Sequence, residues 1–175
     1  MSTVSKKICL IGDFAVGKTS LIRRFVERQF DDKYLSTVGV KISRKTIDLA
    51  SQKPSETLKL QLLIWDIEGS TKFKGIAPNY LQGAKGAIVV ADVSRKETIE
   101  NLPKHIQQFL SVNPKSLLIV ALNKADLADE ETQEKLLQLF QYKDRQQILG
   151  TYLTSAKIGQ NVDEIFQKLA YKIIS

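Results

Sequence analysis

Eight residues near the amino terminus decide the fold, and they read Gly12-Asp13-Phe14-Ala15-Val16-Gly17-Lys18-Thr19. An apolar run at 7–11 precedes them, and a segment of helical periodicity follows at 18–28. The two glycines let the backbone turn tightly and approach a ligand, while the lysine and the threonine supply a cation and a metal-ligating hydroxyl. Because loop N–H groups and the start of a helix attract anions, this stretch predicts a phosphate-binding loop between a strand and a helix.

Apolar runs of strand length alternate with segments of helical periodicity along the rest of the chain. We expect strands at 7–11, 40–49, 57–66, 86–92 and 117–123, a last strand that ends near Thr154, and helices at 18–28 and 161–173. The runs at 86–92 and 117–123 are almost entirely apolar, as central parallel strands are when helices cover both faces of a sheet. The runs at 40–49 and 57–66 predict a hairpin. This alternation is typical of an α/β domain with a mostly parallel sheet.

The size and charge of the chain limit its class. Its 175 residues predict a single domain that spans 1–175. The net charge is +7, but lysine and arginine are scattered, and no basic run is longer than two residues. A nucleic-acid footprint needs a denser basic cluster, so we expect no nucleic-acid partner.

Cysteine usage and hydropathy indicate a cytoplasmic protein. Cys9, the single cysteine, lies in an apolar run and is expected to be a buried thiol, which excludes an intramolecular disulfide. No apolar stretch is long enough to span a bilayer, and the last residues, 171–175, contain no cysteine for a lipid. We therefore expect a cytoplasmic location without an intrinsic membrane anchor, and membrane association only through partners or a missing tail.

A second motif, Asn123-Lys124-Ala125-Asp126, follows one of the apolar strands and bears on the choice of base. A phosphate loop alone would serve an adenylate-type kinase or an ATPase equally well. The carboxylate of Asp126 could accept two hydrogen bonds from the edge of guanine, whereas adenine cannot supply both donors. Hydrogen bonds to a charged group contribute about 1.5–3 kcal/mol each, so two of them would separate the bases by ~100-fold or more. The alternative is a polar turn that caps the strand.

The order and spacing of these motifs resemble those of the small GTPases of the Ras superfamily, and the residues within the motifs are most similar to the Rab branch. Three further stretches carry the resemblance, namely 36–40 (Ser-Thr-Val-Gly-Val), 65–69 (Trp-Asp-Ile-Glu-Gly) and 154–157 (Thr-Ser-Ala-Lys). The resemblance covers essentially the whole chain. It implies the small G-domain of the P-loop NTPases, with a six-stranded, mostly parallel sheet, one antiparallel edge strand and helices on both faces.

The resemblance also implies cofactors and site residues. The cofactors are GTP or GDP and Mg²⁺. The implied nucleotide contacts are Ala15, Val16, Gly17, Lys18, Thr19, Ser20, Phe30, Tyr34, Thr37, Gly69, Asn123, Lys124, Asp126, Ser155, Ala156 and Lys157. The implied metal ligands are Thr19, Thr37 and, through water, Asp66. The implied residues of GTP hydrolysis to GDP are Lys18, Thr37, Gly69 and, as a substitute, Ser70.

Three departures from the family pattern bear on turnover. Ser70 stands where the family has the glutamine that orients the attacking water, and it is too short for that task. Phe14 stands where the family has a small residue, and it would crowd an incoming arginine finger. Glu68 could repel phosphate or act as a substitute base. We therefore expect a switch that hydrolyses GTP slowly; the alternative is a GTP-binding scaffold or adaptor with negligible hydrolysis.

Other features bear on partners or stand apart. By resemblance, effector, exchange-factor and activating proteins would bind the switch loops. The turn at 50–56 is longer than usual in the family and is either an additional docking surface or a tolerated insertion. His105 lies in a polar helical stretch without a second metal ligand nearby, so we expect it at the surface. The acidic run at 129–131 is expected to begin a helix.

Overall fold

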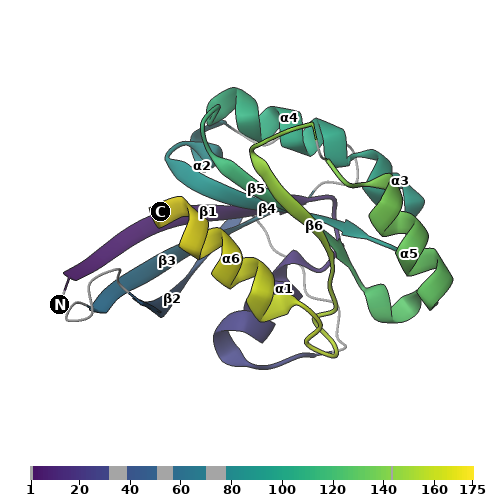
Figure 1. Cartoon of the computed structure of the whole chain (residues 1–175), viewed down its shortest axis with the longest axis horizontal. Helices are drawn as coiled ribbons and strands as arrows, with labels where there is room; N and C mark the ends of the chain where they lie inside the picture. The colour runs from purple at the N-terminus through teal and green to yellow at the C-terminus, as the bar shows by residue number, and fades with distance from the viewer. Residues whose placement is uncertain (1, 32–38, 51–56, 70–77, 143) are drawn as a thin grey trace.

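The computed structural model describes residues 2–31, 39–50, 57–69, 78–142 and 144–175. Within these ranges six strands form one twisted sheet in the order β2-β3-β1-β4-β5-β6 (Figure 1). The strands are β1 Ser2–Gly12, β2 Val40–Ala50, β3 Thr57–Ile67, β4 Ala84–Asp92, β5 Leu117–Asn123 and β6 Ile148–Leu153. Only the edge pair β2 and β3 is antiparallel among these described strands. The predicted mostly parallel sheet with one antiparallel edge strand is confirmed.

Helices cover both faces of the sheet. On one face lie α1 Lys18–Glu27 and α6 Val162–Ile174; on the other lie α2 Pro78–Leu81, α3 Lys96–Glu100 and α4 Leu102–Val112 (Figure 1). Side chains alternate between the faces along each strand. In β1, Ile8 and Leu10 therefore pack with Phe25 and Phe166 of the first helical layer, while Cys9 lies in the other core. The predicted burial of Cys9 is confirmed.

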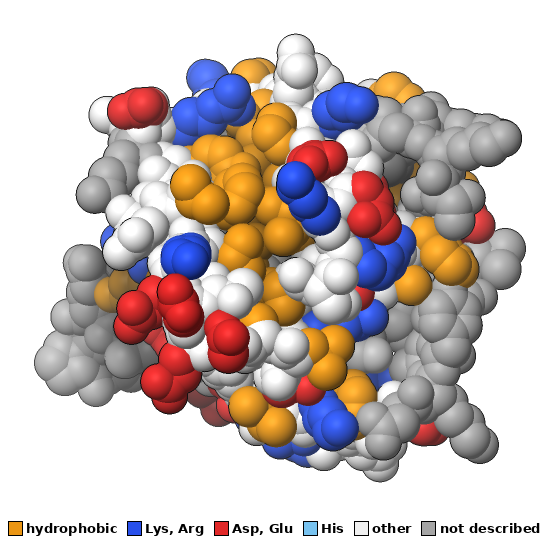
Figure 2. All heavy atoms as spheres, turned by 90° about the vertical axis from the view of Figure 1, so that its right-hand side faces the viewer, with side chains coloured by type: hydrophobic (Ala, Val, Ile, Leu, Met, Phe, Trp, Pro, Cys, Tyr) orange, Lys and Arg blue, Asp and Glu red, His pale blue; other side chains and the backbone are white. Residues whose placement is uncertain are grey.

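Helix α5, Glu130–Leu139, lies beside β6 at the edge of the sheet. Its N-cap is Asp129, whose side chain accepts a hydrogen bond from Thr132 N–H at 2.8 Å, so the acidic run does begin a helix. Figure 2 views this side of the molecule and shows apolar side chains gathered among interspersed basic and acidic ones. Among the described residues, no helix is both long and apolar enough to cross a membrane.

The sheet brings the ends of its strands to one edge. In β1, Gly12 pairs with Val90 of β4, and Asp92 at the end of β4 pairs with Asn123 at the end of β5. Because the strands are parallel, the segments that follow them converge outside their carboxyl ends, where open α/β sheets bind ligands. The phosphate loop and the 123–126 motif therefore lie together.

Candidate nucleotide-binding site

The phosphate loop, residues 12–19, turns between β1 and α1 where only glycine fits at two positions. A Cβ on Gly12 would lie 2.3 Å from Val90 O, and one on Gly17 would lie 2.3 Å from Asn123 Nδ2. Gly17 also has a φ of 101°, a backbone conformation that side chains disfavour. The two glycines therefore let the loop lie directly against β4 and β5.

Lys18 is enclosed by the loop that precedes it. Its side chain is only 6% exposed, and its Nζ donates hydrogen bonds to Gly12 O and Asp13 O at 2.8 Å each. Burial lowers the pKa of Lys18 to about 8, although the carboxylates of Asp66 and Asp13 favour its charged form. A buried cation at this point fits an anionic ligand, because the negative charge of a phosphate would compensate for the hydration that the ammonium group loses on burial.

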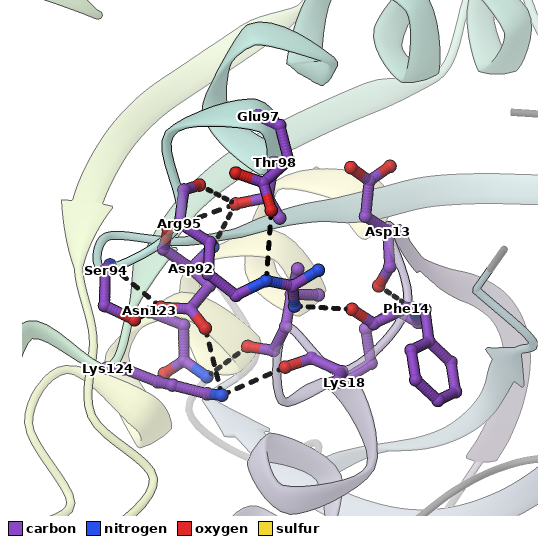
Figure 3. Close-up of polar contacts among 12 residues, drawn as sticks. Asp13, Phe14, Lys18, Asp92, Ser94, Arg95, Glu97, Thr98, Asn123 and Lys124 are labelled. Carbon is purple, nitrogen blue, oxygen red and sulfur yellow. Dashed lines mark hydrogen bonds and ion pairs between the residues drawn. The ribbon is translucent and has the colours of Figure 1, made fainter. Parts of the chain in front are cut away.

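Three consecutive carbonyl groups of the loop are held from outside by side chains of other elements (Figure 3). The donors are Arg95 Nη1 to Phe14 O at 2.7 Å, Lys124 Nζ to Ala15 O at 3.0 Å and Asn123 Nδ2 to Val16 O at 2.9 Å. In a trans peptide the C=O and the next N–H point in opposite directions. The N–H groups of residues 15–17 therefore point inward, where they can donate to phosphate oxygens.

Thr19 and Asp66 together offer a site for a divalent cation. Thr19 Oγ1 donates to Asp66 Oδ2 at 2.6 Å, and Asp66 is almost fully buried at the end of β3. A hydroxyl and a carboxylate are hard oxygen ligands that suit Mg²⁺. Gly69 lies close by, since a Cβ there would be 2.6 Å from Lys18 Nζ. The described residues thus fit a metal ion beside the lysine that would bind phosphate.

The base motif is joined to the last strand. Asn123 Oδ1 accepts from Thr154 Oγ1 at 3.0 Å, so one amide side chain connects β5, the residue after β6 and the phosphate loop. Ser155 Oγ donates to Asp126 Oδ1 at 2.7 Å and holds this carboxylate at an exposed position, where a base could reach it. The motifs at 123–126 and 154–157, about 30 residues apart in the chain, therefore form one site.

The comparisons with known proteins agree with this geometry. The model of the Ras family matches residues 7–175. The chain belongs to the Ras family. It is 36% identical to "GTP-binding protein ypt5" of Schizosaccharomyces pombe over 98% of this chain and 79% of that protein. It is 35% identical to "Ras-related protein Rab-22A" of Mus musculus over 97% of this chain and 84% of that one, and 36% identical to "Ras-related protein Rab-13" of Bos taurus over 96% and 79%. The predicted likeness to Rab proteins is confirmed.

One residue of this Ras-family chain lies elsewhere than we expected. His105 was predicted at the surface, but it is 4% exposed on the inner side of α4, and its Nε2 donates to Asp13 Oδ1 at 2.7 Å. Asn101 Nδ2 donates to the other oxygen, Asp13 Oδ2, at 2.7 Å. Asn101 and His105 are four residues apart and so lie on the same side of the helical segment, turned toward the phosphate loop, whereas Lys104 and Gln107 are exposed. Burial lowers the pKa of His105 although the hydrogen bond to Asp13 opposes this shift.

Several other predicted residues can be placed. Ser20 is partly exposed on α1, Phe30 is partly buried against the core beneath α1 and α6, and Ala156 is buried beside the same core. Lys157 is exposed, and its backbone oxygen accepts from Arg24 Nη1 at 3.5 Å. Tyr34, Thr37 and Ser70 lie outside the described residues, as does most of the turn at 50–56.

Glu68 has a use that its sequence context did not indicate. Its carboxylate accepts a hydrogen bond from Gly39 N–H at 3.1 Å, and its own N–H donates to Gly39 O at 2.8 Å. These two bonds join the residue before β2 to the end of β3. The side chain thus closes the end of the antiparallel hairpin in this structure.

Four site residues were missed by sequence reasoning. They are Asp13, Asp92, Arg95 and Asn101. Asp92 forms an ion pair with Lys124 at 3.0 Å and is almost fully buried, so it orients the lysine that holds Ala15 O. A signal did exist for Asp92, because it is a lone carboxylate at the carboxyl end of an apolar strand. Arg95 and Asn101 follow it within short polar segments, where no spacing pattern distinguishes them from surface residues.

Proposed function

We propose that this Ras-family chain is a guanine-nucleotide switch that binds GTP and GDP with Mg²⁺ and hydrolyses GTP slowly. The observation that carries the proposal is the position of Asn123, whose amide bonds to the phosphate loop at Val16 and to Thr154 beside the base motif. One buried side chain therefore joins the loop that would bind the phosphates to Thr154, next to the segment that would contact the base. A nucleotide needs both at a fixed separation.

Guanine is the base that best fits the described residues. Asp126 is exposed, and Ser155 holds one of its oxygens at 2.7 Å. A carboxylate only accepts hydrogen bonds, and the edge of guanine offers it two donors. The names of the relatives point to the same ligand, since the ypt5 protein is described as GTP-binding.

Slow hydrolysis is expected from the residue types at two sequence positions of the family pattern. Lys18, Thr19 and Asp66 would bind the phosphates and the metal, and Mg²⁺ would neutralise charge as it develops on the phosphate oxygens. Ser70, in contrast, is too short to orient a water, and Phe14 occupies the loop where an arginine finger would enter. Binding groups are therefore present while the groups that accelerate the reaction are replaced. Effector, exchange-factor and activating proteins would read the segments that contain Thr37 and Ser70.

A second function has the same support from Phe14 and Ser70. The chain would then be a GTP-binding scaffold or adaptor whose nucleotide stays intact. Identifying the nucleotide bound to purified protein, and following preloaded GTP with Mg²⁺ over hours in a single turnover, separates the two. Slow GDP formation supports the switch, retained GTP supports the scaffold, and bound ATP would overturn the assignment of the base.

Two variants sharpen this experiment. Ser70→Gln restores the residue that orients water and should raise the single-turnover rate, whereas Asp126→Ala should abolish the preference for guanine nucleotides over adenine nucleotides. A wild-type rate already equal to that of Ser70→Gln would contradict slow hydrolysis caused by Ser70.

A further inference from the structure

We propose that Arg95 is a positioning residue of the phosphate site, which holds the Phe14 carbonyl outward and so directs the Ala15 N–H toward the bound phosphates. The inference rests on the proposed nucleotide binding. Arg95 lies between β4 and α3, outside both the phosphate loop at 12–19 and the base motif at 123–126. The inference gives this segment a role in ligand binding.

Hydrogen bonds hold the backbone of Arg95 in place on both sides of the residue. Its backbone N–H donates to Asp92 O at 3.0 Å, and its backbone oxygen lies 2.8 Å from Thr98 Oγ1, which is fully buried. The Nη1 then donates to Phe14 O at 2.7 Å, while Nε pairs with Glu97 at 3.3 Å (Figure 3). Glu97 is largely exposed, so this ion pair contributes little to stability by itself. The bond to Phe14 O is the better-defined contact of the guanidinium.

The loop needs this contact because of the residue that follows Phe14. Ala15 has a φ of 62°, in the left-handed region that residues with a Cβ disfavour. Rotating the peptide between Phe14 and Ala15 by half a turn would bring Ala15 to a negative φ and relieve the strain. The same rotation would turn Phe14 O inward, toward anionic oxygens, and the Ala15 N–H outward. Arg95 opposes the rotation because the rotated peptide loses its charged donor.

Lys124 supports the next peptide in the same way. Its Nζ donates to Ala15 O at 3.0 Å, and Asp92 orients it. The two peptides on either side of the strained residue are therefore each held by a cation from outside the loop. Burial is the main cause of the lowered pKa of Lys18, and the charge of Arg95 adds a smaller effect in the same direction. A bound phosphate would be attracted by the charges of both Lys18 and Arg95.

The test compares Arg95→Met with Lys96→Met. Methionine keeps much of the aliphatic length of arginine. Lys96→Met is a matched control, because it removes the same charge one residue later from a side chain that is 88% exposed. The dissociation rate of a fluorescent GDP analogue is measured with Mg²⁺, together with the urea midpoint of unfolding. We expect about tenfold faster release from Arg95→Met, equivalent to about 1.4 kcal/mol, and less than a twofold change from Lys96→Met.

Two further variants distinguish positioning from a general structural role. Ala15→Gly removes the strain, because glycine adopts a positive φ freely; in that background Arg95→Met should change release by threefold or less. Arg95→Lys keeps a charged donor and should recover most of the wild-type rate. A purely structural loss would lower the urea midpoint and would not be rescued by glycine at position 15.

The outcomes separate this inference from the proposed function. Wild-type protein that binds no guanine nucleotide refutes the function and the inference with it. Wild-type protein that binds GDP, with Arg95→Met releasing it at the wild-type rate or with no rescue by Ala15→Gly, refutes only the role of Arg95.

Discussion

The buried pair of His105 and Asp13 leads to the sharpest prediction about stability. Replacing His105 by alanine removes the donor from Asp13 Oδ1 and leaves a cavity beneath α4, where the imidazole is 4% exposed. A hydrogen bond to a charged acceptor contributes about 1.5–3 kcal/mol, and the lost packing adds about 1 kcal/mol. Since Asn101 still donates to Asp13 Oδ2, we expect the free energy of unfolding to fall by about 3 kcal/mol, or roughly 6–12 °C in melting temperature.

Urea unfolding at pH 7.5, without added nucleotide, measures this loss. His105→Gln is the matched control, because the glutamine amide can present a donor near the position of the imidazole Nε2. It should lose less than half as much stability as His105→Ala. An alanine variant within 1 kcal/mol of wild type, or a glutamine variant as unstable as the alanine one, would refute the view that the hydrogen bond to Asp13 stabilises the fold.

The same pair gives a pH dependence with a definite sign. Burial lowers the pKa of His105 in the folded state, and Lys18 and Lys104 act in the same direction, against the hydrogen bond that His105 donates to Asp13. Below a pH of about 6.5, His105 binds a proton in the unfolded chain, whereas in the folded chain it stays neutral to a lower pH. Stability should therefore fall as the pH falls, by up to about 1.4 kcal/mol per unit. His105 is the single histidine of the chain, so His105→Gln should remove this slope between pH 7 and 6.

Three further predictions concern the site. Gly17→Ala forces a Cβ to within 2.3 Å of Asn123 Nδ2 at a φ of 101°, so strain and a lost hydrogen bond should weaken GDP binding by ~100-fold in a fluorescence titration; a loss under tenfold would show that the loop can move away. EDTA should speed GDP release from the wild type because it removes Mg²⁺. In Asp66→Asn the release rate should not respond to EDTA, because the carboxylate that would hold the metal is gone. Ser155→Ala frees the Asp126 carboxylate, and the preference for GDP over ADP in competition should fall by about fivefold; an unchanged preference would mean that Ser155 does not orient Asp126.

Local motifs made the fold predictable, and they identified the segments at 12–19, 123–126 and 154–157 that the fold brings together. The bounds of β5, 117–123, agree with the predicted run, because a strand buried on both faces is apolar throughout. Strand β1 instead begins at Ser2 rather than at the predicted residue 7. Its first residues are mostly polar, and they extend the strand because they pair with β3 from Leu58 onward. Pairing with a distant strand cannot be read from the composition of the segment itself.

One physical reason explains why the positions of His105 and Arg95 were not predicted. His105 contacts Asp13 across 92 positions of sequence, and Arg95 contacts Phe14 across 81. Each lies in a polar segment, and polarity indicates exposure unless a distant partner makes burial favourable. The phosphate loop was predicted because phosphate binding in general requires glycine, lysine and threonine at a fixed spacing. Arg95, Asn101 and His105 contact the loop from polar segments outside any recognised motif, and a single sequence carries no spacing rule for them.

The way the loop is held bears on how binding and turnover are divided in this chain. Arg95, Asn123 and Lys124 fix loop carbonyls through bonds within the chain, so in the proposed function folding would meet much of the ordering cost of the phosphate site and would leave nucleotide affinity undiminished. In the proposed function the departures at Phe14 and Ser70 would affect the attacking water and the entry of a partner's arginine, whereas the supporting side chains of Arg95, Asn123 and Lys124 are separate from them. In the proposed function, affinity would therefore depend on supporting residues that the hydrolysis rate does not require, although Lys18 and Thr37 would serve both. A chain built in this way can bind GTP tightly while it hydrolyses it slowly, and a substitution at Ser70 can change the rate without changing the affinity.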